Sequence, residues 1–350
     1  MLIQYRNILL EEVAAVNKAD TLLEIKNLST SFRIKDDYFA AVDDVTLTLR
    51  KNEVLAIVGE SGCGKSTLAT SIVGLHNKQD AKVTGEINYA NKNLAAMTDE
   101  QFNNVRGADI GFIFQDPLSA LNPLMRIDQQ IEESLIYHTK LTKDKRQERV
   151  LELLHQVGIP NPQRTAKQFP HQLSGGMRQR VMIAIALSCK PEIIIADEPT
   201  TALDVTIQAQ ILDLLKQLQA ETSAGIILIT HDLGVVAEMA DRVAVMYAGQ
   251  VIEEAPVNEL FSNPKHPYTR SLLNSIPQMN SEGSKLNVIH GIVPSLKNLP
   301  RSGCRFSSRI PWIETTVHEA EPVMHEVAPD HFVRCTCWQT FHFEEEGDVV

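Results

Sequence analysis

Residues 53–75, EVLAIVGESGCGKSTLATSIVGL, decide the fold class of this chain. The segment contains a short apolar run at 54–58, a glycine-rich loop at 59–67 and a helix-forming run that starts near Lys65. A short, wholly apolar strand is typical of a sheet that is covered on both faces. The order of strand, glycine-rich loop and helix is the context in which a phosphate-binding loop is recognised. We therefore expect an α/β fold with a P-loop NTPase core.

The glycine-rich loop is predicted to bind a nucleotide. Gly62 and Gly64 permit unusual dihedral angles and close approach, so that successive backbone N–H groups can surround an anion at a helix N-terminus. We expect Lys65 to reach the β and γ phosphates and the Ser66 hydroxyl to ligate Mg²⁺. The alternative, a surface glycine-rich turn, is disfavoured by the flanking strand and helix. The predicted ATP-binding residues of the loop are Gly59, Ser61, Gly62, Cys63, Gly64, Lys65, Ser66 and Thr67.

Two later apolar runs end in residues suited to ATP hydrolysis. The run at 193–196 leads to Asp197 and Glu198, and the run at 226–230 leads to His231. Buried carboxylates are unfavourable unless they meet a cation or water, so Asp197 fits a magnesium-associated group and Glu198 fits the group that polarises the attacking water. Strands of one open α/β sheet bind ligands at their carboxyl edge. We expect His231 to contact the γ-phosphate there, with a structural histidine as the alternative.

Three other segments predict further strands and a helix. Residues 22–32 and 42–60 alternate or run apolar in short lengths, which predicts strands of a mixed sheet. Residues 147–157, QERVLELLHQV, have helical periodicity and are followed by Gly158 and Pro160, which predicts a helix that ends there.

Composition narrows the class of protein. The chain has 350 residues, 43% hydrophobic and 22% charged, which suits a folded protein with room for two domains. Its net charge of -11 argues against direct nucleic-acid binding. No run approaches the roughly 18 apolar residues of a membrane span, so we expect any membrane link to run through a partner. Five unevenly spaced cysteines and the absence of a secretory signal favour a reduced, cytosolic protein.

Five motifs, in their order and spacing, resemble those of the nucleotide-binding subunits of ABC transporters. They are GESGCGKST at 59–67, Gln115 within IGFIFQDPLSALNP, LSGGMRQR at 173–180, IIIADEPTTALD at 193–204 and LITHD at 228–232. The resemblance implies an ATPase in which two subunits close around ATP. It also implies a RecA-like core with an antiparallel β subdomain, a helical ABC subdomain and a small C-terminal extension.

The resemblance assigns further roles by position. It implies that Ser174, Gly175, Gly176 and Gln179 reach the nucleotide held by the other subunit, and that Asp204 belongs to a D-loop at 202–204. Glu198, His231 and Gln115 are the implied catalytic residues, and Ser66, Gln115 and Asp197 are the implied magnesium ligands. Phe32 matches the aromatic residue that stacks on adenine, with Tyr38 as a nearby competitor, because either ring could stack.

The implied domains are an N-terminal extension at 1–20, an ABC ATPase domain at 21–255 and an oligopeptide-permease-type extension at 256–350. The helical subdomain, at about 118–178, is the part that docks onto membrane-embedded partners in this family, and Gln115 links it to the hydrolytic site. A helical lid without a membrane partner is the alternative.

The C-terminal region resembles the peptide and nickel importer branch. The matching segments are 260–277, GCRFSSRIPW at 303–312 and HFVRCTCW at 331–338, and the whole resemblance covers about 22–338. Within the branch the chain is most similar to D-type ATP-binding subunits of oligopeptide permeases, of the kind found in lactic acid bacteria. The implied partners are a second ABC ATPase subunit in a heterodimer, two transmembrane permease subunits and an extracellular peptide-binding protein.

This resemblance implies a peripheral position at the cytoplasmic face of the membrane and ATP-driven uptake of oligopeptides. Importers of dipeptides, nickel or another small solute are the alternative. A soluble ABC ATPase is disfavoured because the chain has neither long arms between its motifs nor a second cassette. A regulatory module that does not hydrolyse ATP is disfavoured because all the catalytic positions are retained.

The cysteines of the C-terminal region depart from the family pattern. Many relatives have four cysteines there that can hold an iron–sulfur cluster. Here Cys304 remains, but Ile310 and Val317 occupy the next two positions, and only Cys335 and Cys337 lie beyond. An iron–sulfur cluster is therefore not expected. Three thiolates could hold zinc with one histidine, although ordinary buried or accessible thiols are the favoured interpretation. The candidate histidines are His318, His325 and His331.

Overall fold

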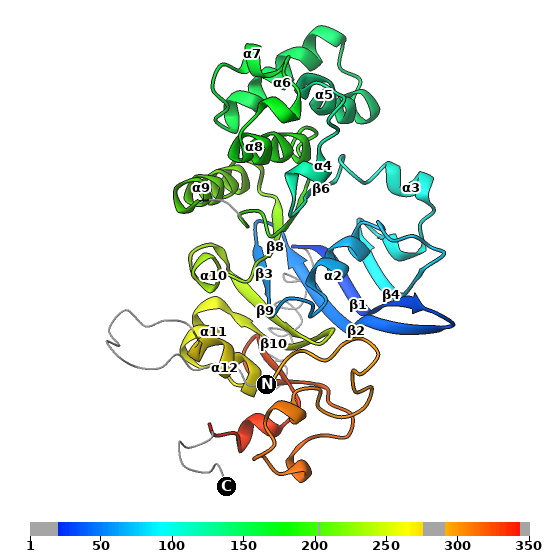
Figure 1. The fold of residues 1–350 in the computed structure, drawn as a ribbon, viewed down its shortest axis with the longest axis vertical. Helices are drawn as coiled ribbons and strands as arrows, with labels where there is room; N and C mark the ends of the chain where they lie inside the picture. Colours follow the sequence, from blue (N-terminus) through cyan, green and yellow to red (C-terminus); the bar gives the residue numbers. More distant parts are fainter. Residues whose placement is uncertain (1–19, 202–203, 276–290, 344–350) are drawn as a thin grey trace, which may run out of the picture.

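The computed structural model describes residues 20–201, 204–275 and 291–343, and its strands form two sheets (Figure 1). The smaller sheet is antiparallel, in the order β2-β1-β4-β5. The larger sheet has eight strands, in the order β11-β12-β10-β9-β3-β8-β7-β6. The predicted N-terminal extension, residues 1–20, lies outside the described residues except for Asp20. The fold class is therefore α/β, as predicted.

The larger sheet has a parallel centre. Its parallel strands are β6 (Ile110–Ile113), β7 (Ile193–Asp197), β8 (Gly225–Ile229), β3 (Val54–Val58) and β9 (Arg242–Tyr247), and β10 (Gln250–Pro256) runs antiparallel to β9. Side chains alternate between the two faces of a strand. Ile194 and Ala196 of β7 pack with the helical region, whereas Ile193 and Ile195 pack with the smaller sheet. Both faces are covered, which is why the residues between the ends of the parallel strands are apolar.

The smaller sheet corrects one expectation. Its strands are β1 (Thr21–Ile34), β2 (Asp37–Arg50), β4 (Ala81–Tyr89) and β5 (Lys92–Asn93). Residues 22–32 and 42–50 therefore do not share a mixed sheet with 54–58, since β1 and β2 pair with each other and β1 pairs with β4. Between β2 and β3, Asn52 has a left-handed backbone with φ of 56°. The turn at Asn52 separates β3 from the antiparallel pair of β1 and β2. The smaller sheet is the predicted antiparallel β subdomain.

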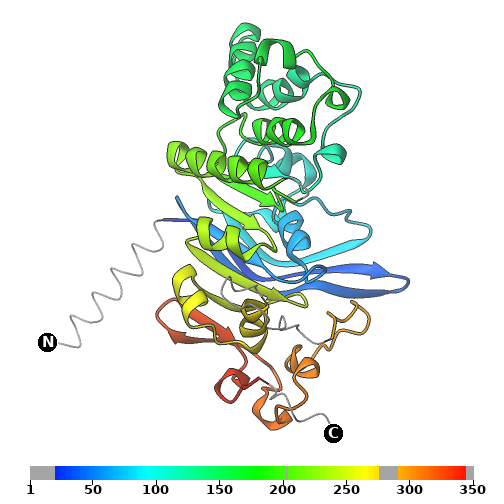
Figure 2. The ribbon, with the colours of Figure 1, turned by 60° about the vertical axis from the view of Figure 1, so that its left-hand side comes forward.

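Most of the helices lie between the phosphate-binding loop and residue 222. Figures 1 and 2 show α5, α6 and α7 at one end of the molecule, beyond the edge of the larger sheet. The helix predicted at 147–157 is α6, which begins four residues earlier and ends at Gln156. The helices up to this point are α2 (Lys65–Ile72), α3 (Asp99–Asn103), α4 (Pro117–Ala120), α5 (Ile127–His138), α6 (Lys143–Gln156), α7 (Pro162–Thr165), α8 (Gly175–Ala186) and α9 (Val205–Thr222).

The C-terminal region completes the larger sheet. Strands β11 (Met324–Ala328) and β12 (His331–Arg334) form a hairpin, and β12 pairs with β10. The helices near this edge of the sheet are α10 (Leu233–Met239), which precedes the C-terminal region, and α11 (Val257–Ser262) and α12 (Pro267–Asn274), which belong to it. Single 3₁₀ turns occupy Leu94–Ala96, Pro170–Gln172, Ser307–Arg309, Thr315–Val317 and Cys337–Gln339. Among the described residues, no helix combines the length and apolar character that a membrane crossing requires.

Candidate nucleotide-binding and hydrolysis site

The glycine-rich loop follows β3 and needs its glycines for two different reasons. A Cβ atom added to Gly59 would lie 2.2 Å from the Met246 carbonyl oxygen, and one on Gly64 would lie 2.5 Å from the Ala41 carbonyl oxygen. Gly62 has open space around it, but its φ of 81° strains any residue with a side chain. The loop therefore passes close to β9 and β2 and turns where only glycine is relaxed. A glycine-rich turn of this kind can direct successive backbone N–H groups at an anion, which suits phosphate.

Lys65, the first residue of α2, is buried against this loop. Its Nζ donates to the carbonyl oxygens of Gly59, at 2.7 Å, and Glu60, at 3.1 Å. These bonds hold the ammonium group at the mouth of the loop, which suits a point charge for phosphate. Cys63 is buried, with its Sγ 3.9 Å from Lys65 Nζ, and burial raises the pKa of the Cys63 thiol. The Cys63 thiol is thus a packing group. Only the backbone of Cys63 is suited to binding phosphate.

Ser66 and Asp197 meet across the sheet. Ser66 Oγ donates to Asp197 Oδ1 at 3.1 Å, which joins the start of α2 to the end of β7. Burial raises the pKa of the Asp197 carboxyl, and the hydrogen bond from Ser66 opposes that shift. A hydroxyl and a carboxylate are the hard oxygen ligands that Mg²⁺ accepts. The pair therefore fits a magnesium site. Gln115, the third predicted ligand, donates instead to Glu198.

Glu198 is the centre of a polar cluster at the same edge. Its Oε2 accepts from Gln115 Nε2 and from Thr201 Oγ1, each at 2.9 Å, and its Oε1 lies 3.5 Å from His231 Nδ1. Glu198 has a left-handed backbone with φ of 47°, and its N–H donates to Ile229 of β8. Such a conformation costs of the order of 1 kcal/mol. This strained backbone lies at the position where the chain directs the Glu198 carboxylate toward the site.

Thr201 is the residue of this cluster that the sequence analysis missed. The Thr201 N–H donates to the Glu198 carbonyl oxygen at 3.2 Å and so closes a turn. This turn places the Thr201 hydroxyl beside the Glu198 carboxylate. The run EPTT could have indicated it, because a threonine three residues after an acid is well placed for a local side-chain bond.

Ser174 and Gly175 lie exposed at the start of α8. Ser174 Oγ accepts from Met177 N–H at 3.3 Å, as an N-cap does. A Cβ atom on Gly175 would meet nothing within 4 Å, whereas one on Gly176 would approach Ile207 to 3.1 Å. The helix N-terminus is therefore open to a second molecule, as the arrangement in which two subunits share a nucleotide requires.

Gln179 does not belong to that open surface. It is buried, and its Nε2 donates to the Pro199 carbonyl oxygen at 2.7 Å. Five residues of α-helix turn its side chain to a different face from that of Ser174. Within its own chain, Gln179 therefore holds the loop that follows Glu198. Its contact with a nucleotide held by another subunit stays a prediction.

Two further predicted site residues, Asp204 and Phe32, lie outside the cluster around Glu198. Asp204 caps α9, with Oδ1 accepting from Ile207 N–H at 3.0 Å, and the other D-loop residues, 202–203, lie outside the described residues. Phe32 is half-buried, and its ring meets that of His76 edge-on, with centroids 5.2 Å apart. His76 follows α2 and its Nε2 lies 3.2 Å from the Thr67 carbonyl oxygen, so Phe32 packs beside α2. Tyr38 is 49% exposed, on the next strand.

Two family models match the chain. Residues 42–201 match the model described as "ABC transporter", and residues 252–312 match the model described as "Oligopeptide/dipeptide transporter, C-terminal region". Among solved structures, the chain is similar to "Dimeric Structure of MJ0796, a Bacterial ABC Transporter Cassette", with a TM-score of 0.61 and 33% identity. That match covers 67% of this chain and 99% of the other.

Curated relatives match nearly the whole chain. The "Oligopeptide transport ATP-binding protein OppD" of Lactococcus lactis subsp. cremoris is 54% identical over 333 residues, which cover 94% of this chain and 98% of the relative. The "Dipeptide transport ATP-binding protein DppD" of Bacillus subtilis is 48% identical, covering 90% of this chain and 94% of the relative. With the phosphate-binding loop, the acidic strand end and the open helix start in one arrangement, this chain belongs to the ATP-binding subunits of ABC transporters.

Proposed function

We propose that this chain hydrolyses ATP to ADP and phosphate to power the import of oligopeptides through partner membrane subunits. The observation that carries the proposal is the cluster of Gln115, Thr201 and His231 around Glu198, beside the Ser66–Asp197 pair. The similarity to oligopeptide transport ATP-binding proteins supports the solute class. We retain the division into residues 1–20, 21–255 and 256–350 as part of this proposal.

The residues divide the chemical work. Lys65 and the N–H groups at 59–67 bind the phosphates of ATP, and Phe32 stacks on adenine. Ser66 and Asp197 hold Mg²⁺, which when bound neutralises charge on the phosphate oxygens. Glu198 accepts a hydrogen bond from the attacking water, while Gln115 and Thr201 fix its carboxylate and His231 contacts the γ-phosphate. Ser174, Gly175 and Gly176 of a second subunit complete the site, and Asp204 lies at the same junction.

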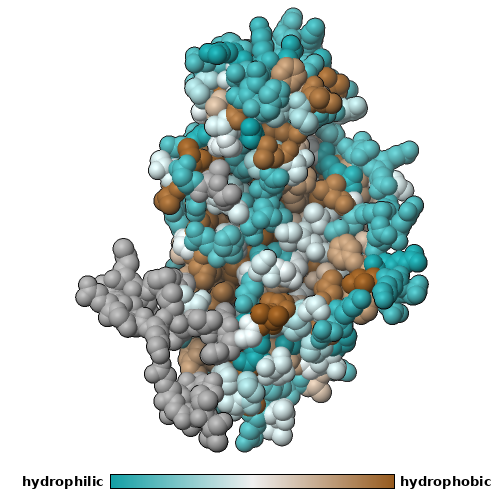
Figure 3. Space-filling view, in the orientation of Figure 1, coloured by the Kyte–Doolittle hydropathy of each residue, from teal (hydrophilic) through white to brown (hydrophobic). Residues whose placement is uncertain are grey.

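The surface supports docking to membrane subunits. Large apolar side chains are exposed on the helical region, where Figure 3 shows brown patches in the upper part of the molecule. Leu124 is 85% exposed and Tyr137 is 77% exposed, and Leu118 and Ile136 are exposed nearby in sequence. An exposed apolar surface of this kind marks an interaction site. Asp116, next to Gln115, caps α4, so the docking region is joined directly to the hydrolytic cluster.

The family supports a proposal for the complete assembly. We infer two transmembrane permease subunits, a second ABC ATPase subunit in a heterodimer, and an extracellular peptide-binding protein that delivers the solute. The chain itself lies peripherally at the cytoplasmic face of the membrane and binds no nucleic acid directly. Dipeptides, nickel or another small solute are the alternative cargo, because dipeptide transport proteins are also among the relatives. A soluble ABC ATPase without a transport role is the weaker alternative.

Reconstitution tests the proposal. The chain is purified with its membrane subunits and second ATPase, placed in liposomes with the binding protein, and assayed for ATP-driven uptake of di- to octapeptides and of nickel. We expect uptake of peptides longer than two residues, and none with Glu198→Gln. Uptake of dipeptides or nickel alone would replace the oligopeptide proposal with the alternative cargo. ATP hydrolysis by the complete assembly without uptake of any of these solutes would contradict the import of peptides and of nickel.

A further inference from the structure

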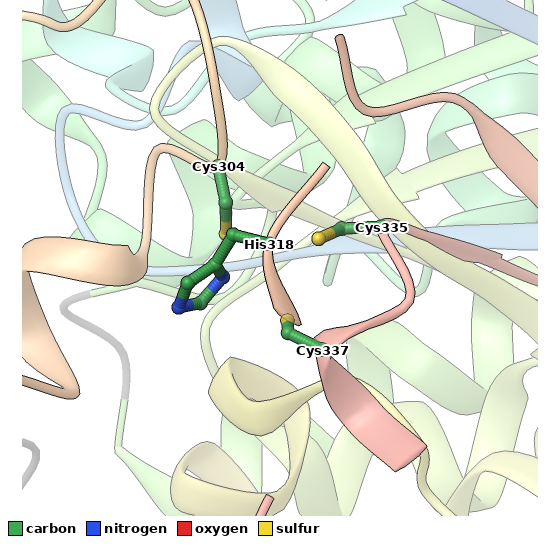
Figure 4. A group of neighbouring side chains, drawn as sticks. All are labelled: Cys304, His318, Cys335 and Cys337. Atoms are coloured by element: carbon green, nitrogen blue, oxygen red, sulfur yellow. The ribbon is translucent and has the colours of Figure 1, made fainter. Parts of the chain in front are cut away.

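Four potential metal ligands converge in the C-terminal region. Figure 4 shows the sulfur atoms of Cys304, Cys335 and Cys337 pointing toward one another, with the His318 ring beside them. One ligand atom from each residue lies within 4.8 Å of all the others. The residues come from separate segments, namely the loop before Ser307–Arg309, the turn after Thr315–Val317 and the end of β12. Their convergence is therefore a property of the fold.

The histidine of this group has unused polar atoms. Both ring nitrogens of His318 are buried, and neither has a hydrogen-bond partner among the described residues. Buried polar atoms are rarely left in this state. The other two candidate histidines are engaged elsewhere, since His325 Nε2 lies 2.6 Å from Glu319 Oε1 and His331 Nε2 lies 2.8 Å from Glu253 Oε1. The buried Nδ1 of His331 has no hydrogen-bond partner either, but it lies 3.5 Å from Glu259 Oε1. Of these three histidines, His318 is the one that has a ring nitrogen beside the three sulfur atoms.

Backbone contacts hold the four ligands in place. Gly303 N–H donates to the Ala320 carbonyl oxygen at 2.8 Å, which ties the segment of Cys304 to that of His318. Cys335 N–H donates to Val323 at 3.2 Å. The three cysteines are buried, with Cys335 and Cys337 exposed by 1% and 0%. These backbone hydrogen bonds hold the segments that carry the four metal ligands. They do not involve the side chains of the ligands.

The donor set suits one zinc ion. In a tetrahedral site with Zn–S of about 2.3 Å and Zn–N of about 2.0 Å, neighbouring ligand atoms lie roughly 3.5–3.8 Å apart. The observed limit of 4.8 Å requires only a small contraction. Three thiolates and an imidazole are a common ligand set of structural zinc, in which the protein fills every coordination position.

An iron–sulfur cluster does not fit the same residues. The family pattern needs four thiolates, but its two middle positions are Ile310 and Val317 in this chain. Ile310 is buried in the apolar cluster of this region, and Val317 packs against that cluster. Apolar side chains fill the two positions, and the remaining sulfur atoms are close enough for a single ion.

We propose that Cys304, His318, Cys335 and Cys337 hold one structural Zn²⁺ ion. Binding converts the three thiols to thiolates, and up to three protons are released to solvent while no group is oxidised or reduced. The ion links the segment at 304–318 to the end of β12, and so fastens the C-terminal segment to the larger sheet. The inference does not depend on which solute is transported.

Elemental analysis tests the site in the full-length chain purified anaerobically under reducing conditions. We expect about one zinc per chain, lost in His318→Ala and Cys337→Ser. Cys189→Ser is the matched control, because Cys189 is half-buried beside Ser134 in the helical region, and it should keep its zinc. Zinc well below stoichiometry in the parent chain, full zinc in both ligand variants, or about four irons with broad visible absorption would each overturn the proposal.

A second measurement covers variants that do not fold. Unsubstituted chain, stripped of metal and refilled with Co²⁺, should show the intense visible and charge-transfer bands of a tetrahedral cobalt thiolate, at one equivalent of metal. Added Zn²⁺ should abolish them, because zinc competes for the same ligands. Weak absorption typical of octahedral cobalt would show that the cysteines are not ligands, and would contradict the site without any substitution.

Discussion

Glu198 shows how one residue is prepared for chemistry. Gln115, Thr201 and His231 surround its carboxylate, and a left-handed backbone aims it. Glu198→Gln should leave ATP binding intact, because the phosphate-binding loop is untouched, and should lower turnover by about 10² to 10⁴, the usual contribution of a general base. Steady-state ATPase assays of the assembled transporter, with nucleotide titration, measure the two effects.

A matched control removes the same charge elsewhere. The control is Glu221→Gln. Glu221 lies near the end of α9, where it accepts hydrogen bonds from Gln156 and Gln217. Because neither partner belongs to the hydrolytic cluster, turnover should not change. Near-normal hydrolysis in Glu198→Gln would assign the water-activating role to another group, with His231 as the next candidate.

At the scale of the elements, the starts of α2 and α8 divide nucleotide binding from subunit closure. Lys65 lies at the first residue of α2, and Ser174 caps α8 with its side chain exposed. Lys65→Ala should weaken ATP binding by the isolated chain, because the charge held at the phosphates is lost. Ser174→Arg should spare that binding and stop turnover in the assembly, because the new side chain blocks closure. Equilibrium nucleotide titration and ATPase assays separate the two lesions.

Two control variants separate the bulk of the new arginine from the loss of the cap and from the added charge. Ser174→Ala removes the same cap, worth about 1 kcal/mol, without adding bulk, so its stability should match that of Ser174→Arg. Ser262→Arg adds the same charge to α11 and should leave turnover unchanged. Loss of ATP binding by isolated Ser174→Arg would contradict a role for Ser174 at the partner's nucleotide.

At the scale of the molecule, the C-terminal region holds the phosphate-binding loop from outside. Tyr268 of α12 accepts a hydrogen bond from Glu60 N–H at 2.8 Å, and Arg309 pairs with the Glu60 carboxylate at 2.7 and 3.3 Å. Arg309→Met leaves the half-buried Glu60 carboxylate without that ion pair. We expect the free energy of unfolding to fall by about 1–3 kcal/mol, and amide exchange at 59–64 to accelerate. Urea unfolding and hydrogen exchange measure these effects.

The control for this prediction is an exposed ion pair. Lys145 and Glu148 lie 2.6 Å apart on the surface of α6, and Lys145→Met should change neither the melting temperature nor exchange in the loop, because exposed pairs contribute little. Unchanged stability and exchange in Arg309→Met would show that the C-terminal region does not restrain the loop.

The parts that the sequence predicted are those with a local physical cause. The strand before Gly59, the glycine-rich turn and the start of α2 follow one another along the chain, so their pattern is complete within 53–75. The meeting of Ser66, Asp197 and Glu198 required one further rule, that parallel strands of one sheet end at the same edge. Thr201 was within reach of the same reasoning, because its contact with Glu198 lies inside a single turn.

Pairings between distant segments have no local cause, and they became visible only in the folded chain. The separation of β1 and β2 from β3 depends on strand register, the inward turn of Gln179 depends on what packs against α8, and the pairing of β12 with β10 joins residues about eighty positions apart. The choice of His318 over His325 and His331 is of the same kind. The residue types alone permitted all three histidines, and the fold places a ring nitrogen of only one of the three, His318, beside the three sulfur atoms.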